Sequence, residues 1–303
     1  MKFTKRLGIS FIFVFCICRI VFTQSLIQKI DNHGYVDWEK FVIHSSGVGA
    51  INVQEPGATQ RIQALQNAKQ AAIKNLLKAV EALTFDTDST VMDALVQSSL
   101  SSAHLQEIVQ GFNLVDTRSM SDMSIEVEIE LPITGRLSEV LLPKICGKGQ
   151  LRLSNKPLCP TCVQPWPEGK PVPEGVTLLN LAEGLLSPNG TPYTGLIIDA
   201  RGLGINPAIT PKILDEDGNE IYGTNYVDRD NAIATGIVTY KDAIKKAIND
   251  SRVGSEPLLF RGLKTSGLLK ADVIISNSDA ALIHSAAHIQ NFLRECKVVF
   301  IID

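Results

Sequence analysis

The sequence predicts an α+β N-terminal domain, in which a long amphipathic helix packs on an antiparallel sheet, followed by an α/β C-terminal domain that ends in a βαβ unit. Three observations carry this prediction. A helical period of apolar side chains runs from about residue 60 to 83, a strand alternates apolar and acidic residues up to Leu131, and the last 32 residues have the order strand, helix, strand.

The N-terminal domain is expected over residues 31–143. Trp38 leads into a short apolar strand at 41–43, and Gly47 and Gly49 follow it. One side of the next helix is apolar and its other side is polar, which is typical of a helix with one buried face. The apolar side consists of Leu65, Ala68, Ala72, Leu76, Ala79, Val80 and Leu83. The later strand places Ile125, Val127, Ile129 and Leu131 on one face and glutamates on the other, so we expect a sheet covered on one side only.

This order resembles the LPP-twenty lipoprotein family and the related N-terminal domain of flagellar assembly protein T. The residues that carry the resemblance are Trp38, the Gly47-Val48-Gly49 turn, the run at 67–77, the segment 89–91 and the strand 125–131. The resemblance covers about a third of the chain and implies a non-enzymatic bacterial envelope module. The alternative is an amphipathic α+β domain of another family.

A proline-rich segment separates the two predicted domains. Six prolines lie between Pro157 and Pro173, which excludes a helix interior or a central strand there, so residues 144–175 are expected to form a linker or a long loop. Residues 176–303 then form the α/β domain. Its expected strands are 194–200, 208–214, 220–223, 233–240, 257–261, 272–276 and 298–302, and its expected helices are 241–249 and 279–295. Residues 215–219 are expected to form a hairpin turn; Glu220 at the sixth position argues against a calcium loop.

The first 25 residues are typical of a secretory signal peptide. Lys2, Lys5 and Arg6 precede an apolar run at 7–18, and cleavage is expected after Thr23 or Ser25. An uncleaved membrane helix is the alternative, but Arg19 interrupts the apolar run. Bulky Phe15 and Ile17 precede the two cysteines at 16 and 18, so a lipid anchor is not expected, whereas contact with a membrane by other means stays open.

The composition disfavours nucleic acid as a partner. Without residues 1–25 the chain has 25 Lys and Arg against 32 Asp and Glu, a net charge of −7. An acidic chain without a basic stripe gains little free energy from the counterion release that drives nucleic-acid binding. The expected location is the periplasm or the periplasmic face of the outer membrane.

Cys159 and Cys162 are the strongest chemical candidates, because a C-x-x-C pair can form a disulfide, half a zinc site or a redox centre. No strand followed by a helix is expected around them, which disfavours redox catalysis. Export favours a structural disulfide or an unpaired thiol. His284 and His288 have a spacing that suits a shared metal, but both are expected on the solvent side of their helix.

A turn after the strand 194–200 is the candidate partner-binding loop. Asp199 and Arg201 flank it, and Gly202 and Gly204 leave its backbone accessible. A structural turn closed by an intramolecular ion pair is the alternative. No third glycine or following helix completes a dinucleotide motif, and the chain has no Gly-x-Ser-x-Gly or Gly-Lys-Ser/Thr motif, so no cofactor and no catalytic residue are expected.

These observations together predict an exported bacterial envelope protein that associates with envelope proteins or an envelope or flagellar-type assembly, with homo-oligomers as a further option. The alternative is a periplasmic thiol- or metal-dependent enzyme that uses Cys159 and Cys162.

Overall fold

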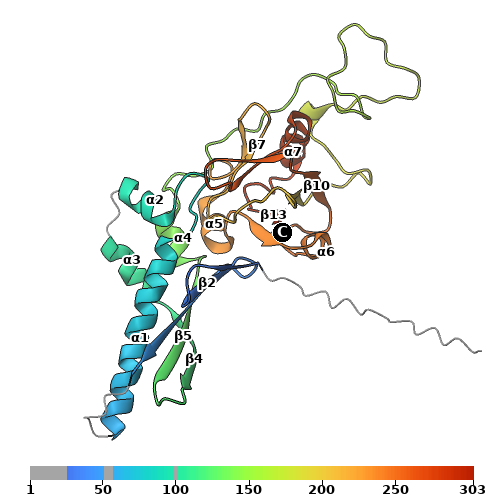
Figure 1. The fold of residues 1–303 in the computed structure, drawn as a ribbon. Coiled ribbons are helices and arrows are strands. Elements are labelled where there is room, and N and C mark those ends of the chain that lie inside the picture. Colours follow the sequence, from blue (N-terminus) through green and yellow to red (C-terminus); the bar gives the residue numbers. More distant parts are fainter. Residues whose placement is uncertain (1–25, 51–56, 99–101) are drawn as a thin grey trace, which may run out of the picture.

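The computed structural model describes residues 26–50, 57–98 and 102–303, so the predicted signal peptide lies outside the described residues. It confirms a mixed α and β chain with an antiparallel sheet in its N-terminal half, and with parallel and mixed sheets in its C-terminal half (Figure 1). Within the described ranges, no helix has the length and apolar character that would let it cross a membrane.

The N-terminal sheet has five antiparallel strands in the order β1-β2-β3-β5-β4. The strands are β1 (Ile27–Lys29), β2 (Gly34–Asp37), β3 (Val42–Gly49), β4 (Asn113–Ser119) and β5 (Ile125–Pro132). Along β5 buried side chains alternate with half-buried ones, because the glutamates point away from the helix that covers the sheet. The edge strand β4 is exposed along its whole length.

The long helix α1 (Gly57–Glu81) lies directly on β3, with its backbone close to that of the strand. Ala64, Ala68 and Ala72 are fully buried and recur every four residues, so they form a flat stripe of small side chains along the helix. Opposite this stripe, Gly47 and Gly49 have no side chain that would separate the two backbones. Small residues on both partners therefore set the short distance between helix and sheet.

Two sheets of four strands form the C-terminal half. All strands of the first are parallel, in the order β10-β6-β13-β9, whereas the second is mixed, in the order β11-β12-β7-β8. The strands are β6 (Gly195–Asp199), β7 (Ile213–Leu214), β8 (Glu220–Tyr222), β9 (Thr239–Lys241), β10 (Pro257–Arg261), β11 (Lys264–Ser266), β12 (Asp272–Ile274) and β13 (Val298–Ile301). The predicted hairpin between β7 and β8 is confirmed, and Asp215 accepts hydrogen bonds from the backbone of Asp217 and Asn219.

The prediction of a strand over 233–240 is wrong in its first part. A helix, α5 (Arg229–Thr235), comes first, because the Asp228 side chain accepts hydrogen bonds from Asp230 and Asn231 and so caps the helix start. Gly236, with φ of 76°, ends the helix and leads into β9. The remaining helices are α2 (Val91–Ser98), α3 (Ser102–Val109), α4 (Arg136–Leu141), α6 (Ile244–Ile248), α7 (Asn277–Ile289) and the 3-10 turn η1 (Leu181–Glu183).

The chain does not end in the predicted βαβ unit. The order β12, α7, β13 is present, but β12 pairs with β7 and β11, whereas β13 is a central strand of the parallel sheet. The length of the connection allows a crossover within one sheet or a passage between two sheets, and strand pairing decides between them. The helix also ends at Ile289, earlier than the expected residue 295.

The two halves share one continuous core. Trp38 and Phe41 from the N-terminal half both contact the ring of Tyr240, with ring centroids 5.8 Å and 6.2 Å away. Tyr240 in turn packs edge-on against Phe300 of β13. Backbone hydrogen bonds from the Ile209 N–H to the Thr84 carbonyl and from the Thr210 N–H to the Phe85 carbonyl add to this contact. The halves are therefore packed together, while the proline-rich segment runs over the outside and projects from the body as a loop (Figure 1).

Candidate functional site

The predicted partner loop lies at the carboxyl end of β6, at one edge of the parallel sheet. The Arg201 guanidinium donates two hydrogen bonds to Asp199, of 2.8 Å from Nε to Oδ1 and 2.7 Å from Nη2 to Oδ2. Arg261 at the end of β10 donates a third, of 3.2 Å, to Asp199 Oδ2. The bonds from Arg201 hold the pKa of the Asp199 carboxyl below its usual range. Both charges of the loop are therefore engaged within the chain.

The glycines complete this turn. Gly202 and Gly204 adopt φ values of 78° and 64°, and the backbone N–H of Gly202 donates to Asp303 Oδ2 over 2.6 Å. The structure thus brings Asp199, Arg201, Gly202 and Gly204 together, with the intramolecular ion pair that the structural alternative expects. Both glycines are exposed, so their backbone is the part of the loop that remains open to solvent. That the loop from Asp199 to Gly204 is a partner-binding surface stays a prediction.

Cys159 and Cys162 are free thiols in the structure, which is the unpaired state that the sequence allows beside a disulfide. The backbone N–H groups of Cys162 and Thr161 donate hydrogen bonds to the Cys159 thiol, and the Cys162 side chain is a further partner. These bonds lower the pKa of Cys159, because they stabilise its thiolate. The pair is arranged as two neighbouring thiols and not as a cross-link.

The prediction that both histidines of α7 are solvated is wrong for His284. His284 is 1% exposed; its Nδ1 accepts the backbone N–H of Arg152 at 2.9 Å, and its Nε2–H donates to the Ile221 carbonyl at 2.9 Å. Burial lowers the pKa of this imidazole, so it is neutral at pH 7. His288 is exposed as expected. His284 therefore links Arg152, near the start of the proline-rich segment, to Ile221 of β8.

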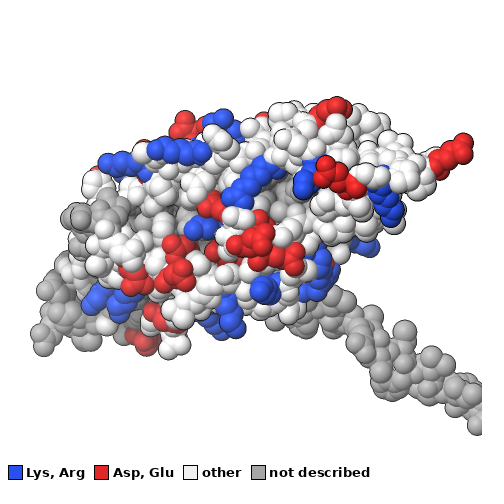
Figure 2. Space-filling model, turned by 90° about the horizontal axis from the view of Figure 1, so that it is seen from above, with Lys and Arg blue, Asp and Glu red and all other residues white. Residues whose placement is uncertain are grey.

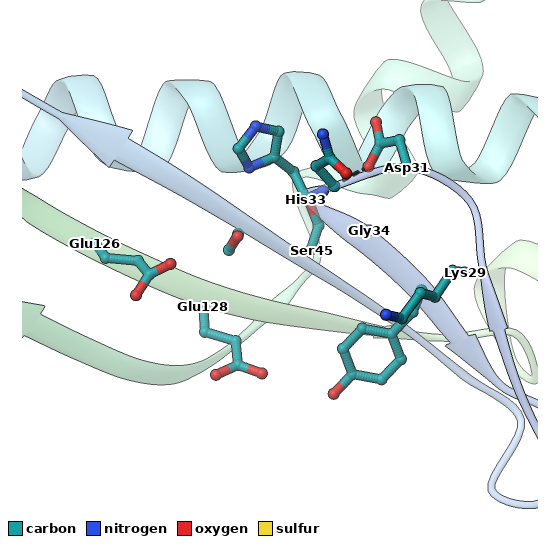
Figure 3. Close-up of a pocket in the computed structure, with 10 residues that line it drawn as sticks. Lys29, Asp31, His33, Gly34, Ser45, Glu126 and Glu128 are labelled. Carbon is teal, nitrogen blue, oxygen red and sulfur yellow. Dashed lines mark hydrogen bonds between the residues drawn. The ribbon is translucent and has the colours of Figure 1, made fainter. Parts of the chain in front are cut away.

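A hollow of about 330 Å³ opens on the face of the N-terminal sheet opposite α1 (Figure 3). Lys29, Asp31 and His33 lie at one end, and Glu126 and Glu128 of β5 lie at the other. Arg118 forms ion pairs with Glu126 and Glu128, at 3.8 Å and 2.9 Å, and so neutralises part of their negative charge. Because its charged side chains contact water, the hollow is a polar surface feature.

A larger hollow is a groove of about 850 Å³ between α2, α3 and α4. Its floor is apolar, whereas charged side chains form its rim. The floor includes Leu95, Ile108 and Leu141, and the rim includes Glu107, Arg136 and Arg229. Arg229 reaches across from α5 and donates to the carbonyl oxygens of Glu139 and Pro143, at 2.6 Å and 3.0 Å. Both halves of the chain therefore build this groove.

No sequence pattern points to this groove, because no helix is expected over residues 92–109 from the sequence. One local signal was available. Thr90 Oγ1 accepts the backbone N–H of Asp93, and Asp93 accepts the backbone N–H of Thr90, which is a reciprocal helix cap at the start of α2. A Thr-x-x-Asp pattern before an apolar run therefore could have predicted α2, but not the side on which it packs.

A buried carboxyl lies where the halves meet. Asp272 is 3% exposed, and its Oδ1 accepts the backbone N–H of Lys212 at 2.8 Å. Burial raises its pKa to about 6; Lys212 opposes this shift, and the carboxylates of Asp86 and Asp88 add to it. Since the folded pKa lies above the unfolded value, folding favours the protonated form. The stability contributed by this proton is present below the unfolded pKa and is lost as the pH rises through 6.

Asp272→Asn should therefore stabilise the protein at pH 7 but not at pH 4. A neutral amide keeps an oxygen for the Lys212 N–H and removes the buried charge, which is a gain of about 2–3 kcal/mol for a shift of this size. Urea unfolding at pH 4 and pH 7 gives the difference in the free energy of unfolding between the variant and the unchanged protein. Contributions from other titrating groups are the same in both proteins and cancel in this difference. An equal difference at pH 4 and pH 7 would contradict a protonated Asp272 in the folded state.

On the face of the molecule seen from above, acidic and basic side chains are interspersed, and no continuous basic stripe crosses that face (Figure 2).

Two comparisons with known proteins bear on the chain. No curated protein matches it. Residues 195–303, roughly a third of the chain, match the family model of the second domain of Treponema pallidum Tp0624. The match begins at β6 and reaches the end of the sequence, so it contains both C-terminal sheets and the Asp199 loop, but neither Cys159 nor Cys162. This part of the chain is similar to the second domain of Treponema pallidum Tp0624.

Proposed function

We propose that this chain is an exported bacterial envelope protein that acts by association with an envelope or flagellar-type assembly, and not by catalysis. Its location would be the periplasm or the periplasmic face of the outer membrane. The observation that carries the association part is the groove between α2, α3 and α4.

The groove has the anatomy of a protein-binding surface. Leu95, Ile108 and Leu141 form an apolar floor, and the charges of the rim surround it, which matches the apolar core and polar rim of protein interfaces. On α2, which contributes Leu95 to the floor, Val96 and Met92 are 75% and 41% exposed. Two exposed apolar side chains next to an apolar groove extend the surface that a partner would remove from water.

The sequence supports the envelope part. The charged start and apolar run of residues 1–25 favour export, and the order of elements from Trp38 to Leu131 resembles the LPP-twenty family and the N-terminal domain of flagellar assembly protein T. The match of residues 195–303 to a domain of a Treponema protein supports a bacterial origin.

Cell fractionation combined with cross-linking in intact cells tests this proposal. We expect the processed chain in the envelope or periplasmic fraction, cross-linked to a discrete partner. Val96→Glu should reduce the cross-linked product at least about tenfold, since a partner that covers α2 as well as the groove would have to bury this charge, at a cost of about 1.4 kcal/mol or more. Ile62→Glu is the matched control, because Ile62 is 60% exposed on α1 and does not line the groove.

Two results would refute the proposal. The first is an unprocessed chain in the cytoplasm, which removes the envelope part. The second is an equal yield of cross-linked product from Val96→Glu, Ile62→Glu and the unchanged protein, which removes the groove as the contact surface. Both variants should unfold at the same temperature as the unchanged protein, because both side chains are exposed.

A further inference from the structure

A hollow of about 300 Å³ lies between α1 and α3, which pack against each other (Figure 1). Ile73 and Leu77 of α1 and Val109 of α3 form its apolar floor. Ile73 and Leu77 are half-buried, so part of their apolar surface still contacts water. None of the residues that line this hollow also lines the groove between α2, α3 and α4, so the two are separate surfaces on opposite sides of α3.

The rim of the hollow is polar and carries a positive charge. Gln70 and Lys74 of α1 lie on one side, and Gln106 and Gln110 at the end of α3 lie on the other. All four side chains are exposed. Among the described residues that line the hollow, none is acidic. A partner at this rim therefore meets three neutral amides and one ammonium group.

The charge at this rim belongs to a basic helix. α1 carries four basic side chains, Arg61, Lys69, Lys74 and Lys78, and one acidic side chain, Glu81. In the parts of the chain that the structure describes, none of these four basic side chains forms an ion pair. Without residues 1–25 the chain has a net charge of −7, so the sign of this helix is opposite to that of the chain. Unpaired positive charge is therefore concentrated beside the hollow.

The shape and the charge of the hollow select one kind of occupant. A groove between two packed helices accepts the apolar side of a third helix, as in helix-in-groove recognition. Its unpaired ammonium groups favour carboxylates in the partner, because complementary charges give specificity. A bilayer surface is too broad to enter a hollow between two helices, and the phosphates of nucleic acid gain nothing from an apolar floor. The α1 helix of a second copy carries the same positive charge and would be repelled.

We infer that the hollow between α1 and α3 binds an amphipathic helix of a partner protein, and that this helix carries acidic residues beside its apolar ones. The apolar side chains of the partner contact Ile73, Leu77 and Val109. Its carboxylates pair with Lys74 and with Lys78, which follows one turn later on the same side of α1. This contact goes beyond the proposed function, because it lies on the opposite side of α3 from the groove.

Fluorescence anisotropy of two labelled peptides mixed with the full chain tests this inference. Both peptides are amphipathic helices of about four turns with leucines on one side. Glutamates flank the leucines in one peptide, and lysines take their places in the other. We expect the acidic peptide to bind at least about tenfold more tightly, with a difference that shrinks as salt is added. The net charge of −7 alone would give the reverse order, so it cannot produce this result.

Substitutions on α1 locate the binding. Lys74→Glu should weaken binding of the acidic peptide about tenfold and Lys74→Gln less, because glutamate adds repulsion whereas glutamine only removes attraction. Arg61→Glu is the matched control. It changes the charge of the same helix equally, but more than three turns before Lys74, where salt screens its effect, so the affinity should stay within about twofold. All three positions in these variants are exposed, and their unfolding midpoints should agree with that of the unchanged protein.

Three results would overturn the inference. The acidic peptide could bind no more tightly than the basic one, or Lys74→Glu could bind it as well as Arg61→Glu does. Binding to vesicles of anionic phospholipid that is lost in Lys74→Glu would assign this face of α1 to a membrane instead. Val96→Glu should bind the acidic peptide normally, because Val96 lies on α2 and does not line the hollow. A failure of this inference is thus distinguishable from a failure of the groove.

Discussion

Gly49→Ala should prevent the N-terminal half from folding around α1. A Cβ atom at residue 49 would lie 1.9 Å from the Ala64 carbonyl oxygen and 2.6 Å from the Ala68 nitrogen. Both atoms belong to the helix backbone, so no side-chain rotation can relieve the overlap. To relieve the overlap, α1 must move away from β3 along its whole alanine stripe. We expect the free energy of unfolding to fall by more than about 4 kcal/mol, measured by urea unfolding or seen as loss of soluble protein.

Gly34→Ala is the matched control for this effect. Gly34 lies in β2 of the same sheet, but a Cβ there would have Ala79 Cβ as its nearest neighbour, at an ordinary 3.4 Å. The cost should stay below about 1 kcal/mol, because no atom has to move far. If Gly49→Ala were as stable as Gly34→Ala, the close contact between α1 and β3 would not exist in solution.

The local part of the N-terminal half could be predicted from the sequence. The alternation in Ile125–Leu131 and the alanine run after residue 67 each depend on side chains within one element, and a period of two or near four reveals which face is buried. The role of Gly47 and Gly49 needed one further step, since their contact is made by residues of α1 that follow them in the chain. The sequence shows the small residues in both segments, but it does not show how closely the backbones of α1 and β3 approach each other.

Predictions that depended on partners distant in the sequence failed. The helical wheel of α7 predicts His284 on the solvent side, because a wheel includes only the side chains of its own helix. The chain before β6 and the strand β8 cover that side and bind both of its nitrogens. In the same way, nothing within residues 272–303 reveals that β12 and β13 join different sheets.

The candidate sites differ in the same way: those within one short segment could be predicted from the sequence, and those built from distant segments could not. The spacing of Cys159 and Cys162 and the order Asp199, Arg201, Gly202 were visible in the sequence, because each lies within one short segment. The groove between α2, α3 and α4 was not, since its lining comes from five separate parts of the chain, of which Arg229 is one. Local motifs thus identified possible chemistry, and only the fold revealed the groove.

A second large effect is expected at Arg252, whose guanidinium is largely buried and binds carbonyl groups instead of a carboxylate. Its Nε donates to Cys296 O and its Nη1 to Thr235 O, both at 2.6 Å, and its Nη2 donates to Gly236 O. A further bond of 2.7 Å reaches Thr239 Oγ1. Burial lowers the pKa of Arg252 but leaves it charged at neutral pH. One side chain therefore fixes the end of α5, the start of β9 and the approach to β13.

Arg252→Met should destabilise the protein by about 3–5 kcal/mol, because the apolar stem remains while three carbonyl oxygens lose their donors. Arg252→Lys should recover only part of this loss, since one ammonium group cannot reach all of the acceptors in the fork geometry of arginine.

Arg118→Met is the matched control. Arg118 is an exposed residue of β4, and its ion pairs with Asp116, Glu126 and Glu128 are open to water. Its replacement should therefore lower the free energy of unfolding by less than about 1 kcal/mol. Equal midpoints of urea unfolding for Arg252→Met and Arg118→Met would contradict the role of Arg252, because a surface arginine leaves no buried acceptor without a partner.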